Sequence, residues 1–380
     1  MLQSTERLSL ARFTPLGKSL DPHVRAFTQN DILQVAQLRA KVLPSGKFTL
    51  DQLLADAKLF LTGPWFDSEL PSLVYEDSDG KIRGFAGRLS RSMVMDGKRI
   101  RVACSTQLIA DPDNPIIGVG RELAYSLASG PQDLSVGSDC NLAAFEVLRR
   151  VKAEGMRGLA LLFSMRWTRL LRPATYALAA IEQRRRSLLR TAGRLPCKFI
   201  DLVATSVPQS PFYRSPTVAT DTSGEELDTS TLITHCEGFL RDRRLWPEYK
   251  PESLAWLFER LAAKTHRGML RKVLVRKRGV ILGWYIYYAK PGSTGEVLQI
   301  VGSKRSLSEV LDHLFDDAYR LGMNAVQGRV DPPLLYEYMA KRCLLQRGDF
   351  LVVHSRNSEL ANAVLRGDAF LSSLEGEDAI

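Results

Sequence analysis

The sequence predicts an α/β protein built from two halves that share one order of elements. Three observations lead to this prediction. First, 380 residues exceed the usual length of a single domain, so about two domains are expected. Second, residues 102–128 have the pattern of an apolar strand, a polar turn and a helix that begins at a Gly-x-Gly step. Third, the helix, hairpin and strand pattern that precedes this segment returns after residue 231.

The segment 102–128 is the centre of the first half. A helix that begins near Gly118 leaves its first backbone N–H groups without intrahelical partners, and the positive end of the helix dipole adds to their attraction for anions. Glycines at 118 and 120 allow a phosphate to approach the backbone closely. Val119, Leu123 and Leu127 recur at helical spacing and predict one buried face. The segment therefore predicts a pyrophosphate site, with tight packing of strand on helix as the alternative.

The elements around this segment follow in a regular order. A short strand near His23 leads into a capped helix, and a hairpin with its turn at Asp79 and Gly80 comes next. After the Gly-x-Gly helix we expect a strand at 133–138 and a helix at 141–152. The first half thus reads strand, helix, hairpin, strand, helix, strand, helix, before a closing strand.

This order of elements resembles the GNAT acyltransferase superfamily. In that family a Gln/Arg-x-x-Gly-x-Gly/Ala turn holds the pyrophosphate of acetyl-CoA or another acyl-CoA, and here the matching segment runs from Pro115 to Gly120. The resemblance implies an α/β (α+β) fold with mixed, mostly antiparallel, twisted sheets flanked by helices, and an acyl-CoA substrate without a metal. It also implies cofactor contacts from Leu108, Ile109, Ala110, Ile116, Gly118, Val119, Gly120, Arg121 and Asn141.

Two positions depart from the family pattern. Pro115 stands where Gln or Arg is usual, and proline removes one N–H donor from the turn. Asn141 and Ala144 resemble the family's Asn-x-x-Ala step, whose Asn lies beside the pantetheine arm. Seven residues after that Asn the family commonly has a tyrosine as general acid, and this chain has Leu148. The donor of a proton to the departing thiolate therefore stays open between water and another tyrosine.

Attack of an amine on a thioester needs a free lone pair, a polarised carbonyl and a stabilised leaving sulfur. By the resemblance, the polarising N–H comes from the stretch 108–110. Candidates for the base are Glu76, Asp111 and Asp139, and we prefer Asp139 because it follows the predicted strand at 133–138. The alternative for Asp111 and Asp139 is capping of a turn or helix.

The second half shows the same order with a changed turn. Helices precede a hairpin with its turn at Arg278 and Gly279, and the next strand runs into Gly302 without a Gly-x-Gly step. We therefore expect a second GNAT-like fold that is degenerate for CoA, in which Lys304 and Arg305 leave a weaker anion site open.

This interpretation divides the chain into five segments. They are an N-terminal tail at 1–20, a GNAT-like domain with the acyl-CoA motif at 21–206, a linker at 207–231, a degenerate GNAT-like domain at 232–356 and a C-terminal tail at 357–380.

The tract from Arg172 to Lys198 combines apolar and basic residues. Such a tract can dock an acidic partner or lie on an anionic membrane surface, and the alternative is an interdomain helix with a solvated basic end. Nucleic acid is not expected here, because the tract lacks interleaved aromatic residues. The net charge of +10 and the pI of about 9.4 also suggest an acidic partner.

Cysteine and hydropathy patterns bear on the compartment. The five cysteines are scattered without a C-x-x-C pair, which argues against a zinc site or a disulfide framework and fits a reducing cytoplasm. The sequence contains no stretch of eighteen uncharged apolar residues, so no transmembrane helix is predicted. We expect a cytoplasmic protein, with peripheral attachment to a membrane as an alternative.

Three functions remain open from the sequence. The first is an acyl-CoA-dependent N-acyltransferase, which carries an acetyl group to a primary amine of an unidentified acceptor. The second is an acyltransferase of the same fold that uses an acyl carrier protein or an aminoacyl-tRNA as donor. The third is a non-catalytic binding protein, suggested by Pro115 and Leu148.

Overall fold

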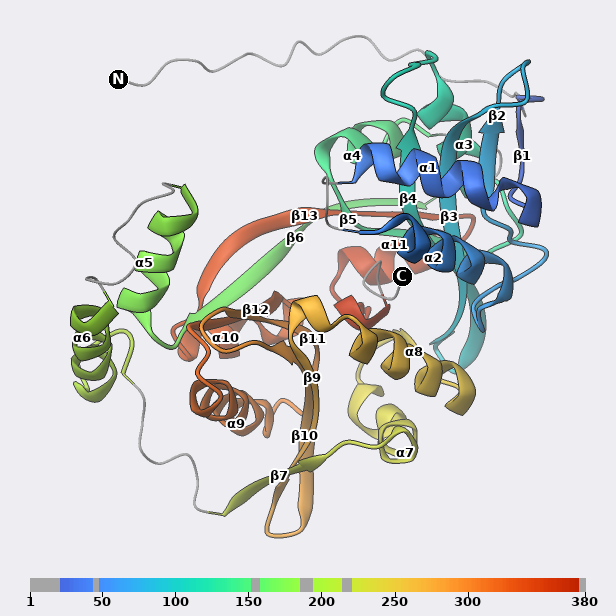
Figure 1. Ribbon diagram of the computed structural model, residues 1–380. Helices are drawn as coiled ribbons and strands as arrows, with labels where there is room; N and C mark the ends of the chain where they lie inside the picture. Colours follow the sequence, from blue (N-terminus) through green and yellow to red (C-terminus); the bar gives the residue numbers. More distant parts are fainter. Residues whose placement is uncertain (1–20, 44–47, 152–157, 185–193, 214–220, 376–380) are drawn as a thin grey trace.

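The computed structural model describes residues 21–43, 48–151, 158–184, 194–213 and 221–375 (Figure 1). The first half contains β1 (Val24–Ala26), α1 (Ile32–Val42), α2 (Leu50–Thr62), β2 (Leu73–Glu76), β3 (Ile82–Met95), β4 (Lys98–Ala110), α3 (Val119–Ala128), β5 (Leu134–Cys140), α4 (Leu142–Leu148) and β6 (Gly158–Leu170). Two helices follow, α5 (Pro173–Arg184) and α6 (Arg194–Ser206). The expected N-terminal tail at 1–20 lies outside the described residues.

The second half begins with a strand inside the expected linker. Its elements are β7 (Thr222–Glu226), α7 (Thr229–Leu240), β8 (Leu245–Pro247), α8 (Pro251–Ala263), β9 (Met269–Lys277), β10 (Val280–Ala289), β11 (Thr294–Gly302), α9 (Leu307–Arg320), β12 (Ala325–Arg329), α10 (Leu335–Ala340), β13 (Leu344–Ser355) and α11 (Ser358–Leu365). Both expected hairpin turns form: Asp79–Gly80 connects β2 to β3, and Arg278–Gly279 connects β9 to β10. Arg278 and Gly279 both have left-handed backbone.

The strands join in one mixed, mostly antiparallel sheet that runs through both halves. Among the described residues its order is β1-β2-β3-β4-β5-β13-β6-β12-β11-β10-β9-β7, and β8 pairs with β3. The β4–β5 and β11–β12 pairs are parallel. The order β7-β9-β10-β11-β12 repeats β1-β2-β3-β4-β5, as the predicted duplication requires.

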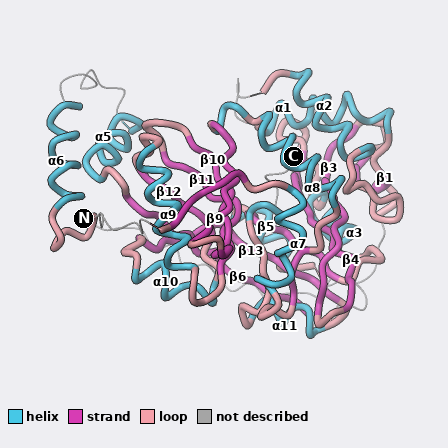
Figure 2. Tube along the Cα trace, turned by 90° about the horizontal axis from the view of Figure 1, so that it is seen from below, coloured by secondary structure: helices cyan, strands magenta, loops and turns pink. Residues whose placement is uncertain are grey.

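Two long strands connect the halves. β6 pairs through Arg166–Leu170 with β12, and β13 pairs through its last residues with β5. β6 and β13 also pair with each other along most of their lengths. Figures 1 and 2 show both strands passing from one half to the other. Each half-sheet therefore includes one strand from the other half. The predicted linker at 207–231 does not describe this exchange of strands.

The chain end expected as a tail packs into the protein. Helix α11 packs on β6 and β13 with Leu360, Ala361 and Val364 buried, and Phe370 and Leu374 lie in the main core. The tail prediction is wrong for residues 357–375, because the apolar residues of α11 form one helical face that gains free energy by leaving water.

The main core lies between the two halves. Apolar residues of α1 and α2 from the first half meet those of α7 and α8 from the second, with Phe60 and Leu257 fully buried. Helices α3 and α4 cover the opposite face of the first half-sheet, and α9 and α10 cover the corresponding face of the second. A cavity beside α8 consequently has walls from both halves.

Helix α6 presents an unusual distribution of polarity. Its buried Asp201 accepts hydrogen bonds from Ala174 N and Thr175 N, which caps α5. Phe199, Ile200 and Leu202 point outward, and Phe199 is 67% exposed. No helix among the described residues has the length and hydropathy to span a membrane.

Candidate functional site

Strands β4 and β5 separate where the site begins. Their parallel pairing covers Val102–Ser105 on β4 and Leu134–Gly137 on β5. Immediately beyond, each strand has a β-bulge: Gln107 and Leu108 stand opposite one residue of β3, and Ser138 and Asp139 stand opposite one residue of β13. Gln107 and Asp139 have left-handed backbone, with φ of 55° and 56°. Because a bulge bends its strand, the two bulges hold the strands apart and leave the end of β4 open toward β5.

A cavity of about 710 Å³ occupies this separation. Its lining from the sheet includes Ser105 to Ile109 of β4, Gly137, Asp139 and Cys140 of β5, and Asn141 before α4. Further lining comes from α1 and α2, including Arg39 and Asp56, and from the C-terminal end of α8. We call this cavity the central cleft. It is shared between the halves, because α8 belongs to the second.

The N-terminus of α3 lies beside the open end of β4. Gly118 has φ of 101°, in the region that favours glycine, and no side chain caps the helix. A Cβ on Gly120 would have Val147 of α4 as its nearest neighbour at 4.0 Å, so the space toward α4 is open. Val119, by contrast, is buried with Leu123 and Leu127, which confirms the predicted packing face of this helix. The backbone of 118–121 is therefore the part of the motif that can bind an anion.

One of the three candidate bases lies in the central cleft. Asp139 lines it, and Oδ1 of Asp139 accepts a hydrogen bond of 2.7 Å from Nη2 of Arg329. Arg329 ends β12 and its side chain is nearly buried. The ion pair therefore joins the two halves at the cleft.

The other two candidates lie elsewhere. Glu76 accepts a hydrogen bond from Nε of Arg25 at the β1–β2 edge of the sheet. Asp111 is buried at the end of β4; burial raises its pKa, but hydrogen bonds from Lys41, the backbone of Asp113, Asn114 and Arg83 outweigh that effect and lower it to about 2. Asp111 anchors the turn that leads to α3. Neither carboxylate lines the central cleft, so we retain Asp139.

Three solved structures share this architecture. A probable N-acyltransferase from Enterococcus faecalis V583 superposes with a TM-score of 0.55 at 11% identity, over 89% of this chain and 73% of that one. A GCN5-related N-acetyltransferase from Anabaena variabilis gives 0.53 at 12% identity, over 88% and 72%. One from Kribbella flavida gives 0.50 at 12% identity, over 87% and 70%. The chain has the GNAT fold. No family model and no curated protein matches its sequence.

The GNAT pattern locates two further residues of the cleft. Oδ1 of Asn141 accepts from Ala144 N at 2.9 Å, so this Asn caps α4 while it lines the cleft. Leu148 also lines the cleft, at the position where the family has its tyrosine. Among the described residues that line the central cleft there is no tyrosine, so the chain offers no phenol to protonate a thiolate there.

The other residues predicted to contact a cofactor divide into two groups. Leu108 and Ile109 line the central cleft beside Ala110. Ile116 is partly exposed on the turn before α3, and Arg121 is ion-paired with Glu122 at 2.6 Å. Their contacts with CoA stay predictions.

The corresponding turn of the second half is closed by its own side chains. The N–H of Ser303 donates to Oγ of Ser306 at 3.0 Å, and a Cβ on Gly302 would lie 3.1 Å from Cα of Leu307. This closure agrees with the expectation that the second half is degenerate for CoA. Among the described residues no group of three potential metal ligands occurs.

The sequence interpretation missed Arg329, which lies 190 positions from its partner Asp139. The duplication makes β12 the counterpart of β5, but it does not state that their ends meet. That contact depends on the pairing of β13 and β6 between these two strands.

Proposed function

We propose that this protein is an acyl-CoA-dependent N-acyltransferase that moves an acetyl group from acetyl-CoA to a primary amine. The observation that carries the proposal is the separation of β4 and β5, at which the central cleft opens, together with the uncapped N-terminus of α3, the helix that follows β4 in the chain. The helix N-terminus suits the pyrophosphate. The open edge of β4 suits the pantetheine arm, which pairs there like an added strand.

The chemistry follows from the residues at the separation. N–H groups of 108–110 polarise the thioester carbonyl, and the amine attacks the carbonyl carbon. The C–N bond forms, the C–S bond breaks and the thiolate takes a proton from water, because Leu148 has no hydroxyl group. Asp139 takes the proton of the amine on Oδ2, while Arg329 holds Oδ1 and orients the carboxylate.

Acetyl-CoA binding tests the proposal through Gly120→Glu. The residue is helical and the space around it is open, so the substitution adds a carboxylate beside the proposed pyrophosphate site without backbone strain. We expect the wild-type chain to bind acetyl-CoA in calorimetric titration and the variant to lose binding. Gly238→Glu on α7 is the control, because Gly238 is also helical with open space around it. Equal binding by wild type and Gly120→Glu would contradict the proposed cofactor site.

We also propose that α5 and α6 contact an anionic lipid surface. The outward residues Phe199, Ile200 and Leu202 form an exposed apolar face, and the sequence from Arg184 to Lys198 contains six basic residues and no acidic one. A second copy of this chain would bring the same positive charge to the contact. An anionic membrane complements both properties, because it accepts apolar side chains below a negatively charged surface.

Vesicle sedimentation tests this contact. We expect the protein to sediment with vesicles that contain phosphatidylserine and to remain free of pure phosphatidylcholine vesicles. Phe199→Ser combined with Leu202→Ser should release it, while Leu344→Ser, another exposed leucine, should not. Binding that survives the double substitution would contradict the role of this face, and binding to an acidic carrier protein without vesicle binding would assign the tract to a donor carrier.

A further inference from the structure

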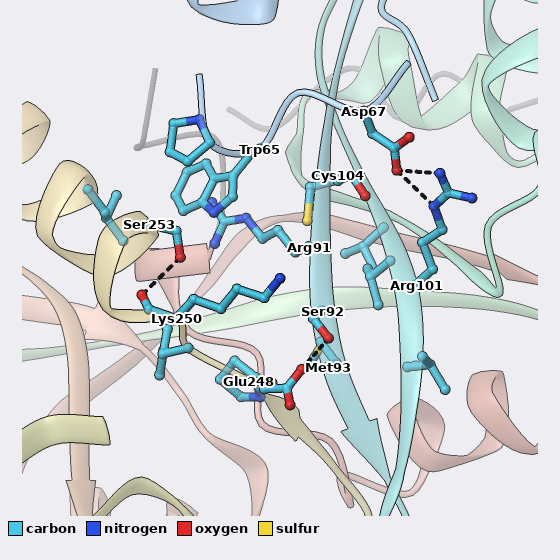
Figure 3. A pocket seen from close by; sticks show the side chains of 18 of the residues that line it. Trp65, Asp67, Arg91, Ser92, Met93, Arg101, Cys104, Glu248, Lys250 and Ser253 are labelled. Carbon is cyan, nitrogen blue, oxygen red and sulfur yellow. Dashed lines mark hydrogen bonds and ion pairs between the residues drawn. The ribbon is translucent and has the colours of Figure 1, made fainter. Parts of the chain in front are cut away.

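A second cavity, of about 480 Å³, lies on the other side of β5 (Figure 3). Val136 and Ser138 line it, whereas Gly137 and Asp139 line the central cleft. Successive residues of a strand point to opposite faces, so the two cavities are separated by the sheet. The second half contributes the beginning of α8 to this cavity. We call it the α8 cavity.

Most charged residues that line the α8 cavity are already paired. Arg101 binds Asp67, Arg99 binds Glu248 at 2.6 Å, and Arg329 binds Asp139 of the central cleft. Lys250 interacts electrostatically with Glu248, whereas two guanidinium nitrogens of Arg91 have no hydrogen-bond partner among the described residues. Lys250 extends toward the cavity from its rim (Figure 3). Among the described basic residues of this lining, Arg91 is therefore the one for which the structure shows no acidic partner.

Arg91 has the geometry of an anion-binding residue. Its side chain belongs to a residue that is only 9% exposed. Cζ of its guanidinium lies 3.7 Å from the centroid of the Trp65 ring, and Nη1 donates to the carbonyl oxygen of Leu374 at 3.5 Å. Nε and Nη2 are buried without a protein partner. These two nitrogens form one edge of the guanidinium, whose parallel N–H bonds match the two oxygens of a carboxylate or phosphate. Buried N–H groups without an acceptor are costly, so the free edge favours an anionic ligand.

We propose that the α8 cavity binds the carboxylate or phosphate group of the amine that accepts the acyl group, with Arg91 as the bidentate partner. This inference rests on the proposed acyltransferase function. The two cavities lie on opposite faces of the sheet at the same place on β4, because Cys104 lines the α8 cavity and Ser105 the central cleft, and beyond Ser105 the strands β4 and β5 no longer pair. Arg329 lines the α8 cavity and binds Asp139 in the cleft. An acceptor held by its anion on Arg91 extends its amine toward Asp139, so the acceptor class is an amine that carries an oxyanion at its other end.

Matched pairs of amines test the proposal. The carboxylate arm uses ω-amino acids of increasing length from β-alanine upward, each against its carboxamide, and the phosphate arm uses phosphoethanolamine against ethanolamine. Binding is measured by saturation-transfer NMR and acetylation by release of free CoA thiol. We expect at least one anionic amine to bind and react about 10- to 100-fold better than its neutral partner, the range for hydrogen bonds to a charged group.

Three variants separate the explanations. Arg91→Met keeps the stem on Trp65 but removes the charge, and it should abolish the preference for the anionic amine while acetyl-CoA binding persists. Arg91→Lys keeps charge without the two-pronged edge and should restore only part of the preference. Arg99→Met, at an exposed position on the same cavity, is the control.

The outcomes distinguish this inference from the proposed function. The inference is wrong if the wild type binds and acetylates anionic and neutral amines equally well, or if Arg91→Met keeps the preference for anionic amines. Either result can occur while acetyl-CoA still binds. If the wild type does not bind acetyl-CoA, the proposed function is wrong instead. If Arg91→Met does not fold, the preference of Arg91→Lys decides, since a preference equal to that of the wild type contradicts bidentate recognition.

Discussion

Replacement of Asp139 by Asn lowers kcat by an expected factor of about 10²–10⁴, the usual contribution of a general base. The amide keeps the size of the side chain and its oxygen still accepts from Arg329, but it cannot take the proton of the amine. KM for acetyl-CoA should stay near that of the wild type, because the proposed cofactor site lies along β4 and α3. The measurement is steady-state release of CoA thiol with the amine that reacts fastest.

The effects on kcat and KM separate a base from a positioning residue. If Asp139 takes the proton, Asp139→Asn lowers kcat while KM for the amine changes little, whereas loss of a residue that only binds the amine raises KM. Asp113→Asn is the control, since Asp113 is an exposed carboxylate on the turn before α3. A variant that retains full kcat would exclude Asp139 as the base and favour solvent in that role.

Replacement of Trp167 by Ala should lower the free energy of unfolding by about 3–5 kcal/mol, as for other fully buried aromatic residues. Trp167 lies on β6 with 0% exposure and stacks on Tyr338 at 5.1 Å between ring centroids. Its Nε1 donates to the carbonyl oxygen of Arg329 at 3.1 Å. The substitution therefore leaves a cavity where β6, β12 and β13 meet and frees the backbone of Arg329.

Equilibrium unfolding in denaturant measures this loss. Phe199→Ala is the control, because a side chain that is largely exposed should change stability by about 0.5 kcal/mol or less. A cost below about 1 kcal/mol for Trp167→Ala would show that the junction repacks and that the shared strands do not depend on this side chain. Reduced kcat in the folded variant would connect the junction to Arg329 and Asp139.

Much of the fold was predictable because its signals are local. The hairpin turns at Asp79–Gly80 and Arg278–Gly279 need residues that tolerate left-handed backbone. The face of Val119, Leu123 and Leu127 appears at helical spacing and is buried as expected. These patterns, repeated in the second half, sufficed to predict a tandem GNAT-like architecture.

The pairing of β6 and β13 was not predictable in the same way. A strand pattern states which residues alternate between faces, but it does not state which strand becomes the neighbour. The same limit applied to α11, whose apolar face is visible in the sequence although its partner strand β6 is far away in the chain. Residues that were expected to be a linker and a tail therefore form strand β7 and helix α11 in the folded protein.

The sequence by itself determined the order of elements, the glycines at the start of α3 and the leucine at position 148. Each of these depends on the conformational preferences of a few neighbouring residues or on their identity alone. Only the tertiary structure decided that Asp139 meets Arg329, that Glu76 and Asp111 lie outside the cleft, and that Arg91 lies beside a second cavity. The physical reason is that a charged side chain acts on whatever lies within a few ångströms, and at this site those neighbours come from two halves joined by exchanged strands.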